Sequence, residues 1–299
     1  IGALFFYTIT MLNIDTLRAL DKTIVSELYR NIFRYLPVFV FAIILFFTQN
    51  QEWLIEVFLA GFLLLFITTT AQTIALFKKF KDKTSENEPF SYAEIFKRSY
   101  PMALSAVAYF IMQSVDIIIL TAYEGYDKVA YYSIAVKLAT VTALALMSVN
   151  IVVAPKIAEI YNNNDHSKLN KLIKDSSRII FSISLPVLIV LFVFSEFILG
   201  LFGENYVLAK EALVILLAAQ LFSAICGPGA IYLNMTGKEQ KLNKILIAGL
   251  LINLILNFVL IPNYGIEGAA IATLISMLFW NTLIVIAIYK SDKIKIFIT

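Results

Sequence analysis

Long apolar runs recur along this chain, separated by short polar stretches that are rich in lysine and arginine. A membrane-spanning helix needs about 20 mostly apolar residues. With 60% hydrophobic and only 15% charged residues, the chain is far more apolar than a soluble protein of its length. It is therefore expected to be an integral membrane protein. The predicted spans lie near residues 30–48, 53–77, 98–122, 129–155, 178–202, 207–236, 242–262 and 266–289, with a truncated one at 1–13.

Basic residues alternate between the two sides of these predicted spans. Of the 24 Lys and Arg residues, 21 fall in every second loop or at the C-terminus, two fall in the intervening loops, and Lys137 falls inside a span. An excess of positive charge is typical of cytoplasmic loops. We therefore expect the basic side and the C-terminus to be cytoplasmic. Because a lipid-exposed open sheet cannot satisfy its backbone groups, the predicted fold class is all-α, a polytopic membrane helix bundle.

The longest polar break divides the chain into three predicted parts. KKFKDKTSENEPFSYAEIFKR, residues 78–98, follows two complete runs and a stub, and six runs come after it. The predicted parts are an N-terminal helix lobe remnant at 1–79, a cytoplasmic inter-lobe linker at 80–97 and a C-terminal six-helix lobe at 98–299. Such an arrangement indicates the second half of a two-lobed transporter. The opening IGALFFYTIT lacks Met and a basic region, so we interpret the chain as a fragment.

Two opposite charges fall inside predicted spans. Asp116 lies about 12 Å of helix before the centre of the loop near Glu124, and Lys137 lies about 18 Å after that centre. Intramembrane charges usually face a cavity or a partner, since each costs about 2.5–3.5 kcal/mol to insert. The two helices are predicted antiparallel neighbours, so Asp116 and Lys137 are able to meet. Their pairing fits either a transport site or a purely structural clip.

Polar residues also follow single helix faces. Tyr109, Gln113 and Asp116 recur at helical spacing, and Asn253 and Asn257 are one turn apart. Together with a stripe through Lys137, they predict a shared aqueous cleft. For the asparagines, a role as hydrogen-bond partners between helices is the favoured interpretation.

Helix-breaking residues interrupt two spans. Pro186 lies inside FSISLPVLIVLF, and Gly227, Pro228 and Gly229 form a consecutive triplet. Proline removes a helix hydrogen bond and glycine lets the backbone bend. These residues are candidate hinges, or static kinks required by packing.

Several classes of function are excluded by what the chain contains. The single cysteine, Cys226, and the single histidine, His166, are too few for an intrachain disulfide, a histidine metal cluster or a histidine triad. MTGKEQK lacks the upstream glycine and the Ser or Thr of a phosphate-binding loop. We therefore expect a transporter rather than an enzyme, with no catalytic residues, metal site, cofactor or nucleic-acid partner. A proton or Na⁺ is the candidate coupling ion.

The order of several segments resembles bacterial polysaccharide flippases, a branch of the multidrug/oligosaccharidyl-lipid/polysaccharide superfamily. The resemblance implies two six-helix lobes around a central cleft, with most of the first lobe's opening helices missing. Residues 1–79 then hold the end of helix 4 and helices 5 and 6, and 98–299 hold helices 7–12. The matching segments are YPMALSAVAYFIMQSVDIIIL, VAYYSIAVKLATVTALA, VAPKIAEIYNNNDHSKLNKLI, FILGLFGENYVLAKEALVILLAAQ, IYLNMTGKEQ, LIPNYGIEGAAIATLIS and LRALDKTIVSELYRNIFR.

The resemblance also implies a substrate and a mechanism. Undecaprenyl-diphosphate-linked oligosaccharide is expected to cross the bacterial inner membrane by alternating access, for O-antigen, capsule or exopolysaccharide biosynthesis. Lys137 matches the basic position of the family's Y-x-x-A-x-[KR] stretch, as a substrate or gating charge. Asp116 matches the family's intramembrane Asp, as its partner or a proton site. Arg18 and Arg98 are phosphate candidates at the cytoplasmic mouth, and a solvated inner-face charge is the simpler interpretation of both.

Alternative functions remain open at this point. A cation-coupled multidrug extruder and a lipid II flippase are relatives within the same superfamily. A membrane-embedded glycosyltransferase or polymerase subunit is an alternative of a different class, although such enzymes need larger outer loops than TQNQE, AYEGYDK, FGENY and PNYGIEG. The expected partners are the lipid-linked oligosaccharide, the bilayer, and a polysaccharide polymerase and glycosyltransferases.

Overall fold

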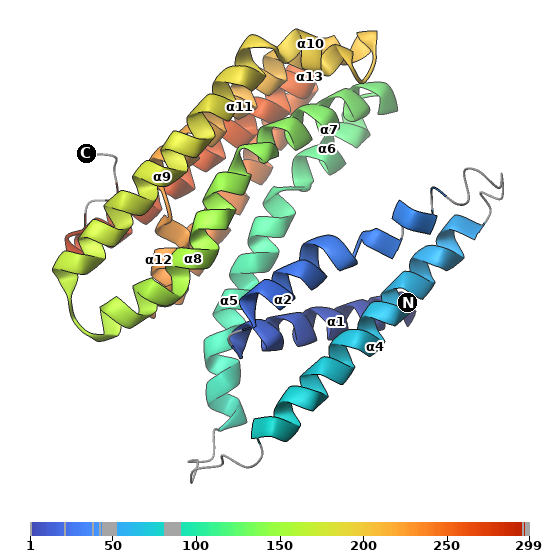
Figure 1. Cartoon of the computed structure of the whole chain (residues 1–299). Coiled ribbons are helices and arrows are strands. Elements are labelled where there is room, and N and C mark those ends of the chain that lie inside the picture. Colours follow the sequence, from blue (N-terminus) through green and yellow to red (C-terminus); the bar gives the residue numbers. More distant parts are fainter. Residues whose placement is uncertain are drawn as a thin grey trace. The chain divides into compact units, whose positions relative to one another are not determined.

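The structure, a computed structural model, describes residues 2–20, 22–37, 39–41, 43, 53–80, 91–294 and 296, and the described elements are all helical (Figure 1). The predicted helical membrane bundle is confirmed, because six of the described helices are long and apolar enough to cross a membrane. The chain divides into two compact units, Ile1–Pro89 (unit 1) and Phe90–Thr299 (unit 2). The division falls within the predicted linker 80–97, of which residues 81–90 lie outside the described part.

Unit 1 is built around two helices that pack along each other. α1 (Gly2–Ala19) contacts α4 (Leu54–Phe80), and α2 (Thr23–Leu28) leads into a short π-helix, η1 (Tyr29–Phe33). The Asn13 amide donates a 2.9 Å hydrogen bond to Thr70 and so links the two long helices. The core residues of this unit are Ile14, Leu17, Tyr29 and Leu65. The predicted span 30–48 falls partly on residues outside the described part.

Unit 2 contains the remaining described helices. In chain order these are α5 (Tyr92–Met112), α6 (Val115–Tyr123), α7 (Tyr126–Val141), α8 (Ala143–Asn162), α9 (His166–Val193), α10 (Ser195–Gly200), η4 (Glu204–Ala209), α11 (Lys210–Cys226), α12 (Gly229–Met235) and α13 (Glu239–Asp292). α13 packs against α5, α6, α11 and α12, so it forms the centre of this unit.

Several predicted spans are interrupted in the structure. The run 98–122 is divided between α5 and α6 at Gln113 and Ser114, and the run 129–155 is divided between α7 and α8 at Thr142. The predicted spans 242–262 and 266–289 are the two arms of α13. They meet at Gly265, whose φ of 54° and ψ of −127° break the helix. A positive φ of this kind is readily adopted by glycine alone.

The glycine–proline–glycine triplet is a tightly packed helix break. α11 ends at Cys226, and Gly227 has a φ of 64° and a ψ of −151°. A Cβ on Gly227 would lie 2.2 Å from Ser177 Oγ of α9, and a Cβ on Gly229 would lie 2.6 Å from Ile284 Cγ2 of α13. The chain therefore turns where two other helices approach its backbone closely. The hinge role of Gly227, Pro228 and Gly229 stays a prediction, as does that of Pro186, which lies inside the single helix α9.

Buried polar side chains separate two apolar cores in unit 2. Along α13, Leu242 and Leu246 belong to one core, Asn253 and Asn257 follow, and Ile261 belongs to the other core. The same order recurs along α7 to α8, α9, α11 to α12 and the second arm of α13. We call these side chains the polar layer: Thr142, Ser177, Ser184, Ser223, Asn253, Asn257 and Ser276. Since membrane helices gain little from apolar contact in lipid, polar contacts of this kind help to fix their packing.

The start of α9 provides a prediction on pH. Asp165 Oδ1 accepts a 3.0 Å hydrogen bond from the Lys168 backbone N–H, and this bond holds the pKa of the Asp165 carboxyl below its usual value. Because the folded-state pKa lies below the unfolded one, the stabilisation is present above about pH 4 and is lost as the pH falls through the folded pKa. The Asp165→Ala variant should therefore lose less thermal stability than the native chain between about pH 5 and pH 3. Thermal unfolding in detergent checks this, with Asp175→Ala as the control; equal pH slopes for Asp165→Ala and the native chain would contradict it.

Candidate functional site

A buried carboxylate joins three helices of unit 2. Asp116, in the first turn of α6, is 3% exposed. Its Oδ2 accepts a 2.7 Å hydrogen bond from the Tyr132 hydroxyl of α7 and a 3.1 Å hydrogen bond from the Thr273 hydroxyl of α13. Its Oδ1 is buried and has no hydrogen-bond partner among the described residues. We call Asp116, Tyr132 and Thr273 the Asp116 cluster. One oxygen of this carboxylate thus accepts two hydroxyl hydrogen bonds, and the other accepts none from the described residues.

The expected pairing of Asp116 with Lys137 is wrong. Lys137 is exposed, and among the described residues the hydrogen-bond partners of the Asp116 carboxylate are Tyr132 and Thr273. The reason is helical geometry: Lys137 follows Tyr132 by five residues, which turns its side chain about 140° around α7 from the side that faces Asp116. Ser133 and Thr140, which share the predicted stripe of Lys137, donate to carbonyls of their own helix.

Two of the three predicted polar stripes do converge. Tyr109 of α5 and Gln113, which caps the end of α5, lie with Asn253 and Thr273 of α13 around a small cavity of about 20 Å³. Its full lining is Tyr109, Met112, Gln113, Asn253, Thr273, Ser276, Met277 and Trp280. Gln113 donates a 3.1 Å hydrogen bond to the Tyr109 hydroxyl. Because Thr273 belongs both to this lining and to the Asp116 cluster, the cavity and the carboxylate adjoin.

The two asparagines are hydrogen-bonded inside the bundle. Asn253 donates a 3.1 Å hydrogen bond to Ser276 and thereby links the two arms of α13. Asn257 donates a 2.9 Å hydrogen bond to the Asn253 carbonyl, and its own Oδ1 has no partner among the described residues. The interpretation as interhelical partners therefore describes Asn253, while Asn257 keeps one buried acceptor unused.

Three residues of this region were not among the sequence candidates. Tyr132 and Thr273 hold Asp116, and Trp280 lines the cavity with its indole N–H unpartnered among the described residues. Hydroxyl residues are common in membrane helices, where they often donate to a carbonyl of their own helix. The residue type alone therefore does not identify a hydroxyl that contacts a carboxylate. The spacing from Thr273 to Trp280, two turns on one face of α13, is the pattern that points to the cavity.

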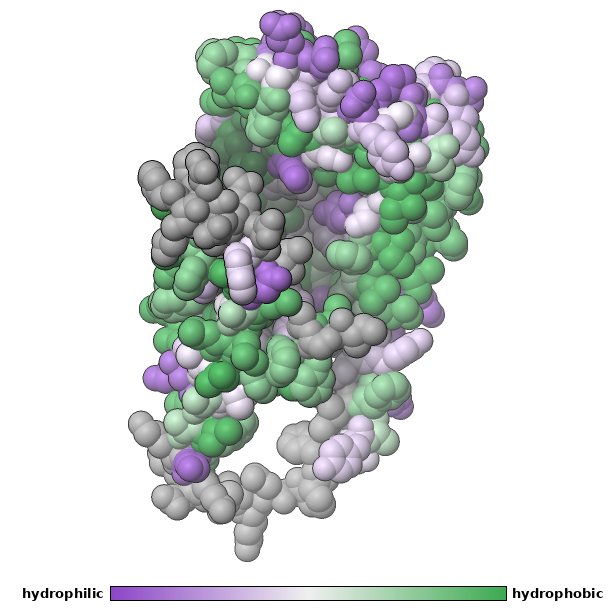
Figure 2. All heavy atoms as spheres, turned by 90° about the vertical axis from the view of Figure 1, so that its right-hand side faces the viewer, coloured by the Kyte–Doolittle hydropathy of each residue, from purple (hydrophilic) through white to green (hydrophobic). Residues whose placement is uncertain are grey.

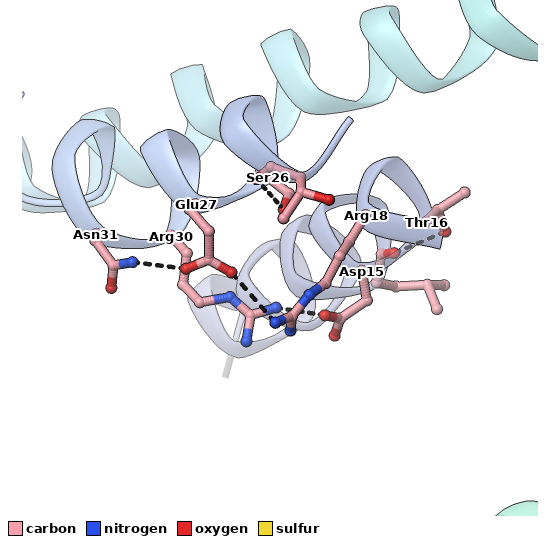
Figure 3. A network of polar contacts seen from close by, with 9 residues as sticks. Asp15, Thr16, Arg18, Ser26, Glu27, Arg30 and Asn31 are labelled. Carbon is pink, nitrogen blue, oxygen red and sulfur yellow. Dashed lines mark hydrogen bonds and ion pairs between the residues drawn. The ribbon is translucent and has the colours of Figure 1, made fainter. Parts of the chain in front are cut away.

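The two predicted arginine candidates differ in what the structure describes. Arg18 of α1 lies 3.7 Å from Glu27 of α2 in a surface network of unit 1 (Figure 3). In the same network Arg30 pairs with Asp15, and Asn31 donates a 2.9 Å hydrogen bond to Glu27. Arg18 thus has a carboxylate partner and ties α1 to α2. Arg98 belongs to α5, and its side chain lies outside the described part.

The surface of the protein fits a lipid environment. Figure 2 shows mostly hydrophobic residues along the helices and a group of hydrophilic residues at the end of unit 2 where α7 begins and α10 lies. Large apolar side chains such as Phe192, Phe197 and Ile255 are more than half exposed. A soluble protein rarely exposes so much apolar surface, so this surface is expected to face acyl chains.

Curated relatives match part of the chain. A Haloferax volcanii protein named "Probable low-salt glycan biosynthesis flippase Agl15" is 26% identical over 186 residues, covering 61% of this chain and 39% of the relative. A Shigella flexneri protein named "Putative O-antigen transporter" is 28% identical over 173 residues, covering 57% of this chain and 41% of the relative. The chain thus spans about two fifths of the length of each of these two relatives.

Solved structures share the fold. The Vibrio cholerae MATE transporter VcmN, solved as a point mutant, matches 97% of this chain and 66% of its own length with a TM-score of 0.71 and 17% identity. A multidrug resistance MATE family transporter of the MOP superfamily, in an outward-facing conformation, matches 68% of this chain and 46% of its own length with a TM-score of 0.57. The model of the MatE family matches residues 101–259, more than half of the chain. The predicted superfamily is therefore confirmed, and the chain belongs to the MatE family of multi-pass membrane transporters.

Proposed function

We propose that this protein flips lipid-linked oligosaccharides across the membrane by alternating access, with undecaprenyl diphosphate as the lipid carrier. The names of the relatives from Haloferax volcanii and Shigella flexneri support a glycan substrate. The proposed location is the inner membrane, with a cytoplasmic C-terminus. Glycosyltransferases and a polysaccharide polymerase are the proposed suppliers and consumers of the substrate.

The observation that carries this proposal is the exposed positive charge of Lys137, which lies within a predicted span of unit 2. Lys137 is exposed in the second half of α7, whereas Asp116 is 3% exposed. An exposed ammonium attracts an anionic diphosphate and repels a cationic drug, and the effect is strong where water is scarce. A hydrated glycan and its diphosphate cannot cross hydrocarbon unaided, whereas the apolar polyprenyl tail stays in the hydrocarbon core of the bilayer. The accessible cation therefore favours the lipid-linked glycan over a cationic drug.

We further propose that Asp116 holds the coupling ion, a proton or Na⁺. The buried and unpartnered Oδ1 supports this role, since a buried acceptor without a partner is unfavourable unless something binds it. Intramembrane carboxylates of this kind commonly form ion or proton pathways. Tyr132 and Thr273 hold the other oxygen in place, so an ion bound at Oδ1 would act on α6, α7 and α13 together.

The proposed function is tested by complementation. The whole gene product is expressed in a bacterial strain whose own O-antigen flippase is deleted and whose glycosyltransferases are intact. We expect surface polysaccharide to return, as measured by immunoblot, with the empty vector as control. Drug susceptibility and rescue after depletion of the lipid II flippase are measured in parallel. Drug resistance or lipid II rescue without restored polysaccharide would assign one of the other transport functions.

Lys137→Ala should abolish this export. Because the variant removes the exposed cation of α7 and changes nothing in the Asp116 cluster, we expect polysaccharide at the surface to fall at least about tenfold while the amount of protein in the membrane stays unchanged. Lys137→Arg should retain export, and Lys210→Ala, at the outer start of α11, serves as the matched lysine control. Normal export by Lys137→Ala would remove this residue from the mechanism.

A further inference from the structure

A second polar region of unit 2 lies away from the Asp116 cluster, where α5 and α13 begin. The second and third turns of α5 and the first two turns of α13 border an open groove of about 460 Å³. The residues that line it are Phe96, Lys97, Tyr100, Pro101, Gln240, Asn243 and Lys244. Two ammonium groups, two side-chain amides and a phenol therefore surround one space. Lysines serve as point charges for phosphate groups, so this set of residues favours an anion.

The amides of the groove favour an anion that also carries hydroxyl groups. Asn243 Oδ1 is buried and has no hydrogen-bond partner among the described residues. A phosphate diester has no proton to give to this acceptor, whereas a hydroxyl on the same headgroup has one. Gln240, which is exposed beside it, offers a second acceptor and two donors.

The aromatic side chains of the groove indicate that the anion is part of a lipid. Phe96 and Tyr100 stack with their ring centroids 5.9 Å apart, and they are 69% and 54% exposed. Aromatic residues gather at the level of the headgroups in membranes, and basic residues next to a membrane helix attract anionic lipids. A soluble phosphate would make no use of these rings.

We infer that this groove binds the headgroup of an anionic phospholipid of the surrounding bilayer, with phosphatidylglycerol as the best-fitting class. Lys97 and Lys244 neutralise the phosphate, Asn243 and Gln240 bind the glycerol hydroxyls, and Phe96 and Tyr100 lie against the start of the acyl chains. The inference does not depend on the glycan substrate, because the groove is separate from Asp116 and Lys137.

Native mass spectrometry of the purified whole protein tests this inference. Dissociation constants are measured for phosphatidylglycerol, phosphatidic acid and phosphatidylcholine with matched acyl chains. Each lysine near a membrane surface adds about a fivefold preference for anionic lipid, so Lys97→Gln with Lys244→Gln should weaken phosphatidylglycerol binding about 25-fold. Lys156→Gln with Lys171→Gln, two exposed lysines elsewhere in unit 2, has the same net charge and should leave binding unchanged. Asn243→Ala should reduce the preference for phosphatidylglycerol over phosphatidic acid.

Competition distinguishes the sources of phosphate. Neither inorganic phosphate nor glycerol 3-phosphate should displace the bound lipid at millimolar concentration, and undecaprenyl phosphate should compete no better than phosphatidic acid. Displacement by free phosphate would overturn the lipid assignment, and preferential displacement by undecaprenyl phosphate would assign the groove to the transported lipid instead. Equal losses in the two lysine double variants would show general charge attraction and no specific groove. Size-exclusion profiles confirm that each variant is folded before binding is compared.

Discussion

Replacing Gly227 with alanine should destabilise the protein by about 3 kcal/mol or more, because two separate penalties coincide at this position. Its φ of 64° and ψ of −151° belong to a region that is essentially restricted to glycine, and other residues pay about 1–3 kcal/mol to enter it. In addition, the new Cβ would lie 2.2 Å from Ser177 Oγ and 2.9 Å from Ser177 Cβ. Thermal unfolding and proteolysis in detergent measure the loss.

Alanine substitutions at other glycines of unit 2 distinguish the backbone penalty from the steric penalty. A Cβ on Gly125 would meet nothing within 4 Å, and its φ of −67° suits any residue, so Gly125→Ala should be neutral. Gly237 also has open space around it but a φ of 70°, so Gly237→Ala should lose only about 1 kcal/mol. Adding Ser177→Gly to Gly227→Ala should restore the stability that is lost to the steric clash. The stability lost to the unfavourable backbone conformation should remain lost. If Gly227→Ala lost no more stability than Gly237→Ala, the clash with Ser177 would be relieved by separation of α9 and α11 at this point. Such separation is the behaviour of a hinge.

The positions of the long helices of this protein could largely be predicted from its sequence, whereas the side of the membrane that each loop faces stays a prediction. Apolar length locates the helices because it follows from the energetics of lipid, which act on each segment alone. Gly265 illustrates the limit of this approach. The predicted spans on either side of it correspond to the two arms of α13, yet the sharp turn between them depends on one positive φ. The breaks at Ser114 and Thr142 were missed, since neither glycine nor proline marks them.

The contacts of the candidate site could be predicted only in part. The faces carrying Tyr109, Gln113 and Asn253 were visible from helical periodicity, and these residues share the small cavity. The partner of Asp116 was predicted wrongly, because charge complementarity favoured Lys137 and gave no weight to rotation around α7. A tyrosine and a threonine hydroxyl hold the carboxylate instead. Hydrogen bonds of this kind depend on the rotation and depth of each helix, which one sequence does not specify.

Asp116→Asn should abolish transport while the fold is kept. The amide oxygen of asparagine is able to accept the hydrogen bonds from Tyr132 and Thr273, so the three helices stay joined. The negative charge is lost, however, and with it the proposed site for a proton or Na⁺. We expect export in the complementation assay to fall to background, with thermal stability within about 1 kcal/mol of the native chain.

Asp116→Ala should in contrast destabilise the protein, because it leaves the Tyr132 and Thr273 hydroxyls buried without an acceptor. Each unsatisfied hydroxyl is expected to lower the free energy of unfolding by about 1–3 kcal/mol. Adding Tyr132→Phe and Thr273→Val removes both orphaned donors, so this triple variant should recover the part of the stability that those donors cost, while the cavity left by the missing carboxylate remains. Transport should stay absent in the triple variant. Stability and transport would then respond differently to the same residue, which a structural clip cannot explain. Normal export by Asp116→Asn would instead identify the cluster as a clip between α6, α7 and α13, and the coupling ion would have to bind elsewhere.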